Sequence, residues 1–143
     1  MTRPVIDSPM PRRVAAVEAT IARFEGRPLK YGRDDCTRMV AFALRRLGVR
    51  TPLLKAGSYS SALGAAKAMK RMGFDTLDQA VDAIGLPRIA PAMCLPGDII
   101  ALPAEQHGVA LMLAVGNGRA FGYFDGRFQV GQPLMFDAAW RSI

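Results

Sequence analysis

The feature that most constrains the fold is a change of hydrophobic pattern at Gly85. Before this glycine, apolar residues recur every three to four positions, as they do on one face of a helix. After it, short apolar runs alternate with turn residues, and Pro87, Pro91 and Pro96 exclude long helices. Helices followed by paired strands are typical of an α+β fold, with N-terminal helices packed on a C-terminal antiparallel β-sheet.

Apolar spacing and end signals predict four helices in the first part of the chain. Val14, Val17, Ile21 and Phe24 would form the buried stripe of the first helix. Each expected helix is followed by a glycine, which favours a helix end. The helices are expected over residues 11–25, 36–47, 60–72 and 76–84, with a loop over 49–59.

Short apolar runs and tight-turn residues predict an antiparallel sheet after residue 97. Gly116-Asn-Gly118 and Asp125-Gly126 are strong hairpin signals, because two-residue hairpin turns need positive φ, which Asn, Asp and Gly tolerate. Asp98 is interpreted as a turn residue where the first strand begins, and Cys94 as a packing residue. The strands are expected over residues 98–102, 109–115, 119–124, 127–130 and 139–143.

Length and composition favour one domain over residues 1–143, because half of the 143 residues are hydrophobic and can form a core. We expect an N-terminal arm over 1–10, a helical half over 11–85 and the sheet over 97–143. The longest apolar run, 109–115, is far too short to span a membrane. The first thirteen residues lack the apolar core of a signal peptide, so we expect synthesis in the cytoplasm without one.

The net charge of +7 is concentrated in the N-terminal part of the chain. Residues 1–50 hold eleven Lys and Arg against five Asp and Glu. Such a surface suits an acidic protein, an anionic cell envelope or nucleic acid, or it is simply a solvated helical face. We expect a protein partner, since the basic residues spread over two helices and a loop and no nucleic-acid-binding motif is present. Arg outnumbers Lys 15 to 4, and Arg pairs well with carboxylates.

Cys36 is the leading candidate for a nucleophile. It directly follows Asp34 and Asp35, either of which can cap the helix that Cys36 begins. A thiol in the first turn of a helix lies near unpaired N–H groups, which favour the thiolate and can hold an oxyanion. Arg33 and Arg38 would add to this effect, whereas the two aspartates would oppose it. The plain alternative is a small buried residue at a helix start.

His107, the single histidine, follows Cys36 by 71 residues and is the one imidazole that can serve a thiol as base. A cysteine at a helix start with a later histidine at a strand start is the papain-type order. The second cysteine, Cys94, leaves one disulfide conceivable, although two free thiols are the expectation. With no Cys-x-x-Cys pair, we expect no structural metal and no cofactor.

Several short motifs resemble the NlpC-type cysteine peptidases. Lys30-Tyr-Gly-Arg-Asp-Asp-Cys-Thr37 resembles the family's Asp-Cys-Ser motif, and Pro96-Gly-Asp-Ile-Ile100 resembles its Gly-Asp-hydrophobic strand. The segment from His107 to Gly118 resembles its His-Val-Gly hairpin, which ends in Gly-Asn-Gly. Gly57-Ser-Tyr-Ser60 and Ala138-Ala-Trp-Arg141 are similar to a small phage and prophage branch of tail-associated proteins.

The resemblance implies a papain-like fold in which Cys36 is the nucleophile and His107 the base. Active members cleave peptidoglycan stem peptides without a cofactor, and phage members lie at the tail tip beside other tail proteins. The implied location is therefore a virion or a tail-like particle. The resemblance leaves open a second function, that of a tail-tip adaptor that keeps the fold and has lost catalysis.

Two departures from the family pattern concern the residues around the base. If the Gly-Asn-Gly turn is used as the anchor, the family's histidine position falls on Ala110, three residues after His107. On a regular strand this offset would place the two side chains on opposite faces, unless Gly108 hosts a bulge that turns His107 inward. The strand expected over 119–124 also offers no obvious polar residue to orient the base.

Overall fold

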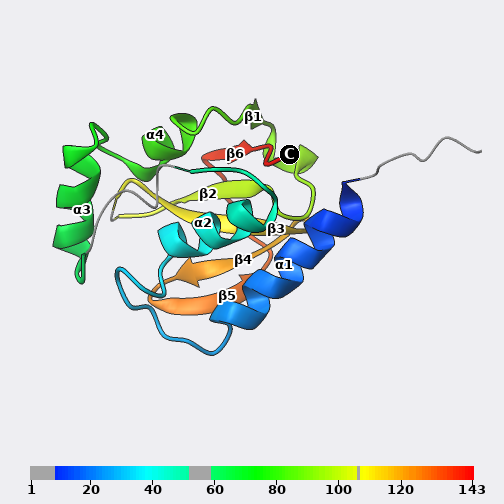
Figure 1. Ribbon diagram of the computed structural model, residues 1–143, viewed down its shortest axis with the longest axis horizontal. Coiled ribbons are helices and arrows are strands. Elements are labelled where there is room, and N and C mark those ends of the chain that lie inside the picture. Colours follow the sequence, from blue (N-terminus) through cyan, green and yellow to red (C-terminus); the bar gives the residue numbers. More distant parts are fainter. Residues whose placement is uncertain (1–8, 52–58, 106) are drawn as a thin grey trace, which may run out of the picture.

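The computed structural model describes residues 9–51, 59–105 and 107–143, and it has the predicted order of helices followed by sheet (Figure 1). The expected arm over 1–10 falls almost wholly outside the described residues. In the part of the chain that the structure describes, no helix is long and apolar enough to cross a membrane. The helices are α1 (Met10–Phe24), α2 (Cys36–Arg46), α3 (Ala62–Arg71), α4 (Leu77–Asp82) and the 3₁₀ turn η2 (Pro91–Met93).

The second half forms a six-stranded antiparallel sheet in the order β1-β6-β2-β3-β4-β5. Both predicted hairpins are confirmed, and their turn residues have positive φ: Asn117 and Gly118 join β3 to β4, and Asp125 and Gly126 join β4 to β5. The strands are β1 (Arg88–Ile89), β2 (Ile99–Pro103), β3 (Val109–Gly116), β4 (Arg119–Phe124), β5 (Arg127–Gly131) and β6 (Ala138–Trp140).

Two strands differ from the sequence prediction. The last strand ends at Trp140, and it crosses back to lie between β1 and β2. The two-residue strand β1 was not predicted, because Pro87 and Pro91 flank it and two residues carry no period. Both differences depend on which distant strand supplies the hydrogen-bonding partner, and local pattern does not report that.

The main core lies between the helices and one face of the sheet. Met39, Val40 and Leu44 of α2 are fully buried against a cluster that includes Leu111 and Leu113 of β3. The alternate residues of β3, such as Met112, belong to a smaller apolar cluster on the opposite face. Figure 1 shows α1 and α2 lying across the same face of the sheet, with α3 at one end of the molecule.

A buried ionic cluster ties α1 to the sheet. Arg13 Nη1 donates to Asp98 Oδ1 at 2.8 Å, and Arg141 Nη1 donates to Asp98 Oδ2 at 2.9 Å. Asp98 also accepts hydrogen bonds from the backbone N–H groups of Leu95 and Ser142. Asp98 is thus more than the turn residue expected from sequence.

The prediction that Val14 lies on the buried stripe of α1 is wrong. Its side chain is 40% exposed, and the neighbouring Arg13 is fully buried in its place. The helix is rotated so that the guanidinium of Arg13 reaches Asp98, and Val17 and Phe24 keep their predicted places in the core.

Candidate active site

Asp35 fixes the approach to α2 and so positions Cys36, the first residue of that helix. Asp35 is the N-cap: its Oδ1 accepts from the backbone N–H of Arg38 at 2.8 Å. Its Oδ2 accepts from the N–H of Gly32 at 2.7 Å and from the hydroxyl of Tyr59 at 2.9 Å. These three bonds hold the Cys36 backbone between the loop before α2 and the chain at Tyr59.

Gly32 is required by the same arrangement. It has a φ of +84°, and a Cβ atom built there would lie 1.9 Å from the carbonyl oxygen of Tyr59. Only glycine therefore fits this close approach of the two segments. The sequence analysis included Tyr59 only within the Gly57-Ser-Tyr-Ser60 motif and gave it no role, because its partner Asp35 lies 24 positions earlier in the chain.

The environment of Cys36 favours the neutral thiol. Burial, with a contribution from the Asp35 carboxylate, raises the pKa of the Cys36 thiol to about 11, although hydrogen bonds from the Leu111 backbone and from Thr37 act in the opposite direction. The sequence-based expectation of a lowered thiol pKa is therefore wrong, because desolvation exceeds the effect of the helix N-terminus. Cys36 and Cys94 are both free thiols, as expected.

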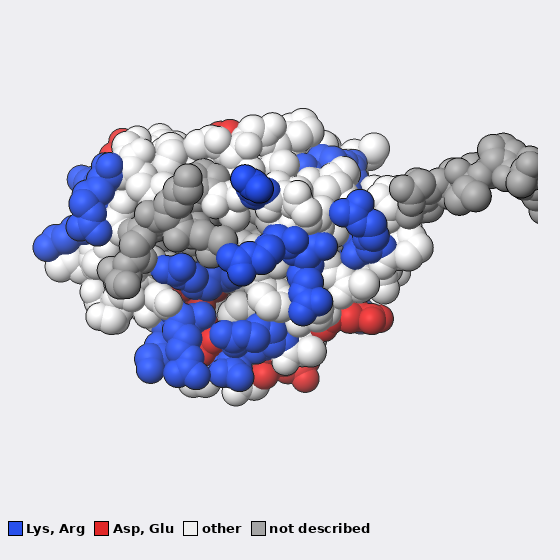
Figure 2. Space-filling view, in the orientation of Figure 1, with Lys and Arg blue, Asp and Glu red and all other residues white. Residues whose placement is uncertain are grey.

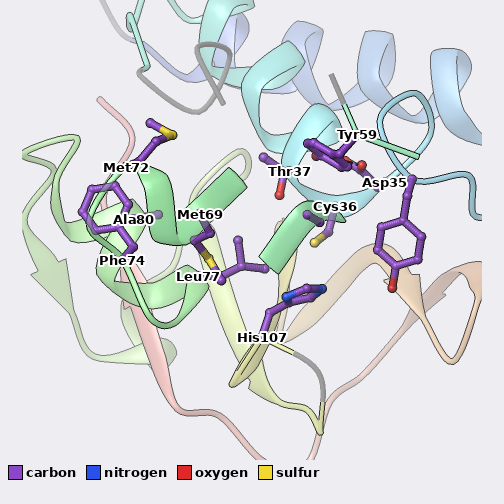
Figure 3. A pocket seen from close by; sticks show the side chains of 12 residues that line it. Asp35, Cys36, Thr37, Tyr59, Met69, Met72, Phe74, Leu77, Ala80 and His107 are labelled. Atoms are coloured by element: carbon purple, nitrogen blue, oxygen red, sulfur yellow. Dashed lines mark hydrogen bonds between the residues drawn. The ribbon is translucent and has the colours of Figure 1, made fainter. Parts of the chain in front are cut away.

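A left-handed turn brings His107 to the same pocket. His107 and Gly108 have φ values of +59° and +79° and directly precede β3. The His107 carbonyl accepts from the N–H of Leu77 at 3.1 Å, and a Cβ on Gly108 would lie 2.8 Å from Thr76 Cγ2. The turn is thus packed against the start of α4, and Figure 3 shows the imidazole facing the Cys36 sulfur.

The turn also separates His107 from Ala110, where the family's histidine would fall. Ala110 alternates along β3 with Val109 and Leu111, whose side chains belong to the helix-side core. The Ala110 side chain therefore belongs to the other face of β3, the face of Met112. A strand bulge at Gly108 is not needed, because the two left-handed residues before the strand redirect the histidine.

The imidazole of His107 is electrically neutral near neutral pH. Partial burial lowers the pKa of His107, and the Asp35 carboxylate opposes this shift only in part. Its Nε2 atom is buried and has no hydrogen-bond partner among the described residues, and the ring of Tyr31 lies edge-on at a centroid distance of 6.3 Å.

Two cavities meet at the thiol and the imidazole. A pocket of about 50 Å³ extends toward α3 and α4, and an open groove of about 410 Å³ extends along the start of β3. Both are lined by Tyr31, Asp35, Cys36, Leu77 and His107. Within the described ranges no group of three His, Cys, Asp or Glu residues is arranged to hold a metal ion. The chemistry that this arrangement supports is a thiol attack assisted by a neutral imidazole.

Comparison with known proteins places the chain in a family. No curated protein matches it. A family model described as a domain of unknown function, DUF6950, matches residues 10–142, from the start of α1 to the penultimate residue. The chain therefore belongs to the DUF6950 family.

Proposed function

We propose that the protein is a cysteine peptidase of papain-like, NlpC-type architecture, in which Cys36 is the nucleophile and His107 the general base. One observation carries the proposal: the left-handed turn at His107 and Gly108 brings the chain's single imidazole to the cavities that the thiol at the start of α2 also lines (Figure 3). Backbone N–H groups of the first turn of α2 lie beside the thiol, and acyl transfer requires such donors for its oxyanion.

The reaction begins from a neutral thiol and a neutral imidazole. His107 takes the proton of the thiol while the Cys36 sulfur attacks the amide carbonyl carbon, and the N–H groups at the start of α2 hold the oxyanion. The C–N bond then breaks, and the imidazolium gives its proton to the leaving amine. Water, deprotonated by His107, attacks the thioester, releases the carboxylic acid and restores the thiol.

The substrate and the setting come from the sequence resemblance to the NlpC-type family. It points to the amide bonds of peptidoglycan stem peptides and to a place in a virion or tail-like particle beside other tail-tip proteins. The protein would reach that particle by assembly after synthesis in the cytoplasm. Cys36 and His107 are the residues at which this proposal is tested.

The basic face of the molecule supports a protein partner in such a particle. Figure 2 shows Lys and Arg side chains spread over the face on which α1 and α2 lie. They form a dispersed surface and do not line one recognition helix, so a carboxylate-rich protein fits them better than a DNA groove does. The exposed basic residues of α1, α2 and the adjoining loops are Arg12, Arg27, Lys30, Arg33, Arg45, Arg46 and Arg50.

A titration against duplex DNA at near-physiological salt tests this choice of partner. We expect weak binding that higher salt abolishes, as for non-specific electrostatic contact, with Kd of roughly 10⁻⁴ to 10⁻⁶ M. Markedly tighter binding would replace the protein partner with nucleic acid.

A catalytically inactive adaptor is the second candidate, and the environment of Cys36 favours it. A thiol whose pKa is raised to about 11 is almost wholly protonated at neutral pH, so its reactivity depends on His107. An adaptor would keep the fold and the basic face without using the pocket.

Hydrolysis of purified muropeptides distinguishes the two functions. We expect the wild-type protein to release a new amine and a new carboxylate, and Cys36→Ala to abolish release. His107→Ala should reduce the rate roughly 10²–10⁴-fold, the usual contribution of a general base. Cys94→Ala is the matched control, because Cys94 packs against the cluster on the opposite face of the sheet. Hydrolysis that survives in Cys36→Ala would contradict the role of Cys36 as nucleophile. An inert wild-type protein would leave the adaptor as the function.

A further inference from the structure

The smaller cavity beside Cys36 has an apolar wall made by two helices. Behind the thiol, α3 and its end contribute Ala65, Met69 and Met72, and α4 contributes Leu77 and Ala80, with Phe74 between them. Figure 3 shows Met69, Met72, Phe74, Leu77 and Ala80 on the side of Cys36 away from Asp35. The polar residues Asp35, Thr37, Tyr59 and His107 lie at the end of the pocket next to the thiol.

We propose that this pocket is the specificity pocket of the enzyme, and that it holds a small uncharged aliphatic side chain on the acyl residue of the cleaved amide. The inference rests on the proposed peptidase function, and it names the substrate class that function would act on. Met69, Met72 and Leu77 are its selecting residues, since they form the wall that a substrate side chain would contact.

The two cavities would hold the two halves of the substrate, which meet at the amide bond that is cleaved. The leaving amine takes its proton from His107, whose neighbouring residues Ala104, Glu105 and Val109 line the open groove. Thr37, in the first turn of α2 where the oxyanion would be held, lines the small pocket and not the groove. The acyl half of the substrate therefore lies toward the small pocket, and the amine half lies in the groove.

The size of the pocket restricts the side chain that it can hold. Its volume is about 50 Å³, whereas an engineered apolar cavity that admits benzene measures about 150 Å³. A methyl or isopropyl group fits such a space, and an aromatic ring does not. Filling it with an aliphatic group removes apolar surface from water on both sides, which is favourable.

The charges at the pocket exclude an ionised side chain. Asp35 is the acidic residue at its rim, and both of its oxygens are already engaged by the N–H groups of Gly32 and Arg38 and by the hydroxyl of Tyr59. A substrate carboxylate would meet this negative charge and would lose its water in a cavity with a largely apolar wall, and both effects are unfavourable. A substrate ammonium would likewise have to displace an existing donor.

The test is a series of peptides that differ only in the acyl residue, which is glycine, alanine, valine, phenylalanine or glutamate. We expect the wild-type kcat/KM for valine to exceed that for glutamate by at least ten-fold, and that for phenylalanine to fall below that for valine, since one methylene in an apolar pocket is worth roughly 10- to 200-fold. Equal rates across the series would overturn the pocket and leave the peptidase function standing.

A pocket-filling variant gives a matched comparison. Ala65→Leu places extra carbon atoms in the cavity, and we expect it to lower kcat/KM for valine at least ten-fold more than for glycine, given the same apolar discrimination. Ala66→Leu, the next residue of α3, does not line the cavity and should leave that ratio unchanged. Equal loss for both peptides would show general disruption and would contradict the proposal.

Peptide binding to the Cys36→Ala variant tests the pocket independently of the cleavage reaction. By calorimetry, this variant should bind the valine peptide more tightly than the glutamate peptide, and Cys36→Ala with Ala65→Leu should lose that preference. If the wild-type protein hydrolyses nothing but the preference remains, the peptidase function fails while the apolar pocket stands. If the Cys36→Ala variant shows no preference, the pocket fails, whatever the wild-type hydrolysis shows.

Discussion

Asp35 and Asp98 are both buried aspartates that accept several hydrogen bonds, but their partners differ. Asp98 lies between the guanidinium groups of Arg13 and Arg141, and its neighbours close around it. Asp35 takes its hydrogen bonds from neutral donors, two backbone N–H groups and a tyrosine hydroxyl, and it lines both cavities. The carboxylate of Asp98 is neutralised within the fold, whereas that of Asp35 acts on Cys36 and His107.

A buried charge contributes to stability when cations compensate it, and it changes the chemistry of its neighbours when neutral dipoles do so. Asp98, matched by two cations, fastens α1 and the end of the chain to β2. Asp35, whose partners among the described residues are neutral dipoles, leaves a negative potential in a pocket that also contains the thiol. Substitutions at the first cluster should therefore change stability most, and substitutions at the second should change reactivity most.

The largest effect is expected for Arg13→Met. Removing this cation leaves the fully buried Asp98 with only part of its compensation, and breaking a buried ion pair in this way costs about 3–5 kcal/mol of unfolding free energy. Urea denaturation measures the loss. Arg12→Met is the control, since exposed Arg12 makes one hydrogen bond to the Leu47 carbonyl, and it should cost about 1 kcal/mol. Similar losses for both variants would contradict the structural role of the cluster.

Asp35→Asn should change the reactivity of the thiol more than the stability of the fold. The helix cap and part of its hydrogen bonding are retained, so we expect a stability loss of about 1 kcal/mol. Without the negative charge, the pKa of Cys36 should fall below about 11, and alkylation by iodoacetamide near pH 8 should become faster. Asp34→Asn provides the comparison. An unchanged or slower alkylation rate in Asp35→Asn would show that the charge does not govern the thiol.

The pKa of His107 gives a second test of the electrostatics of the pocket that Asp35 lines. Because the folded-state pKa of His107 is lowered, the unfolded chain binds the proton more readily, and stability should fall as pH drops below about 6.5. Above that pH both states hold a neutral imidazole, and the contribution vanishes. His107→Gln should reduce this loss of stability at acid pH. The chain has one histidine, so a proton NMR titration reads its pKa directly. A pKa at or above 6.5 would refute the burial of the ring.

The smallest effect is expected at the exposed pair of Arg88 and Asp82. Two hydrogen bonds of 2.8 and 2.7 Å join them, but both side chains are more than two-fifths exposed. Arg88→Ala should cost less than about 1 kcal/mol by thermal or urea denaturation, because water screens exposed ion pairs. A loss near that of Arg13→Met would show that burial does not set the difference between the two pairs.

The local features of this protein could be predicted from its sequence. Helix spacing and end signals located α1 to α4, Asp35 was one of two residues predicted to cap α2, and the residue types of the two hairpin turns determined how β3, β4 and β5 pair. It also placed Cys36 at a helix start, because the cap and the apolar stripe lie within a few residues of it. Such features depend on backbone preferences and near neighbours, which the chain carries in any context.

Properties that depend on contacts between distant segments became visible in the folded structure. The position of β6, the burial of Arg13 against Asp98 and the facing of His107 toward Cys36 each join residues more than thirty-five positions apart. The direction of the Cys36 pKa shift also depends on distant segments. The helix start favours the thiolate, but the burial that outweighs it comes from elements that pack around the thiol only in the folded chain.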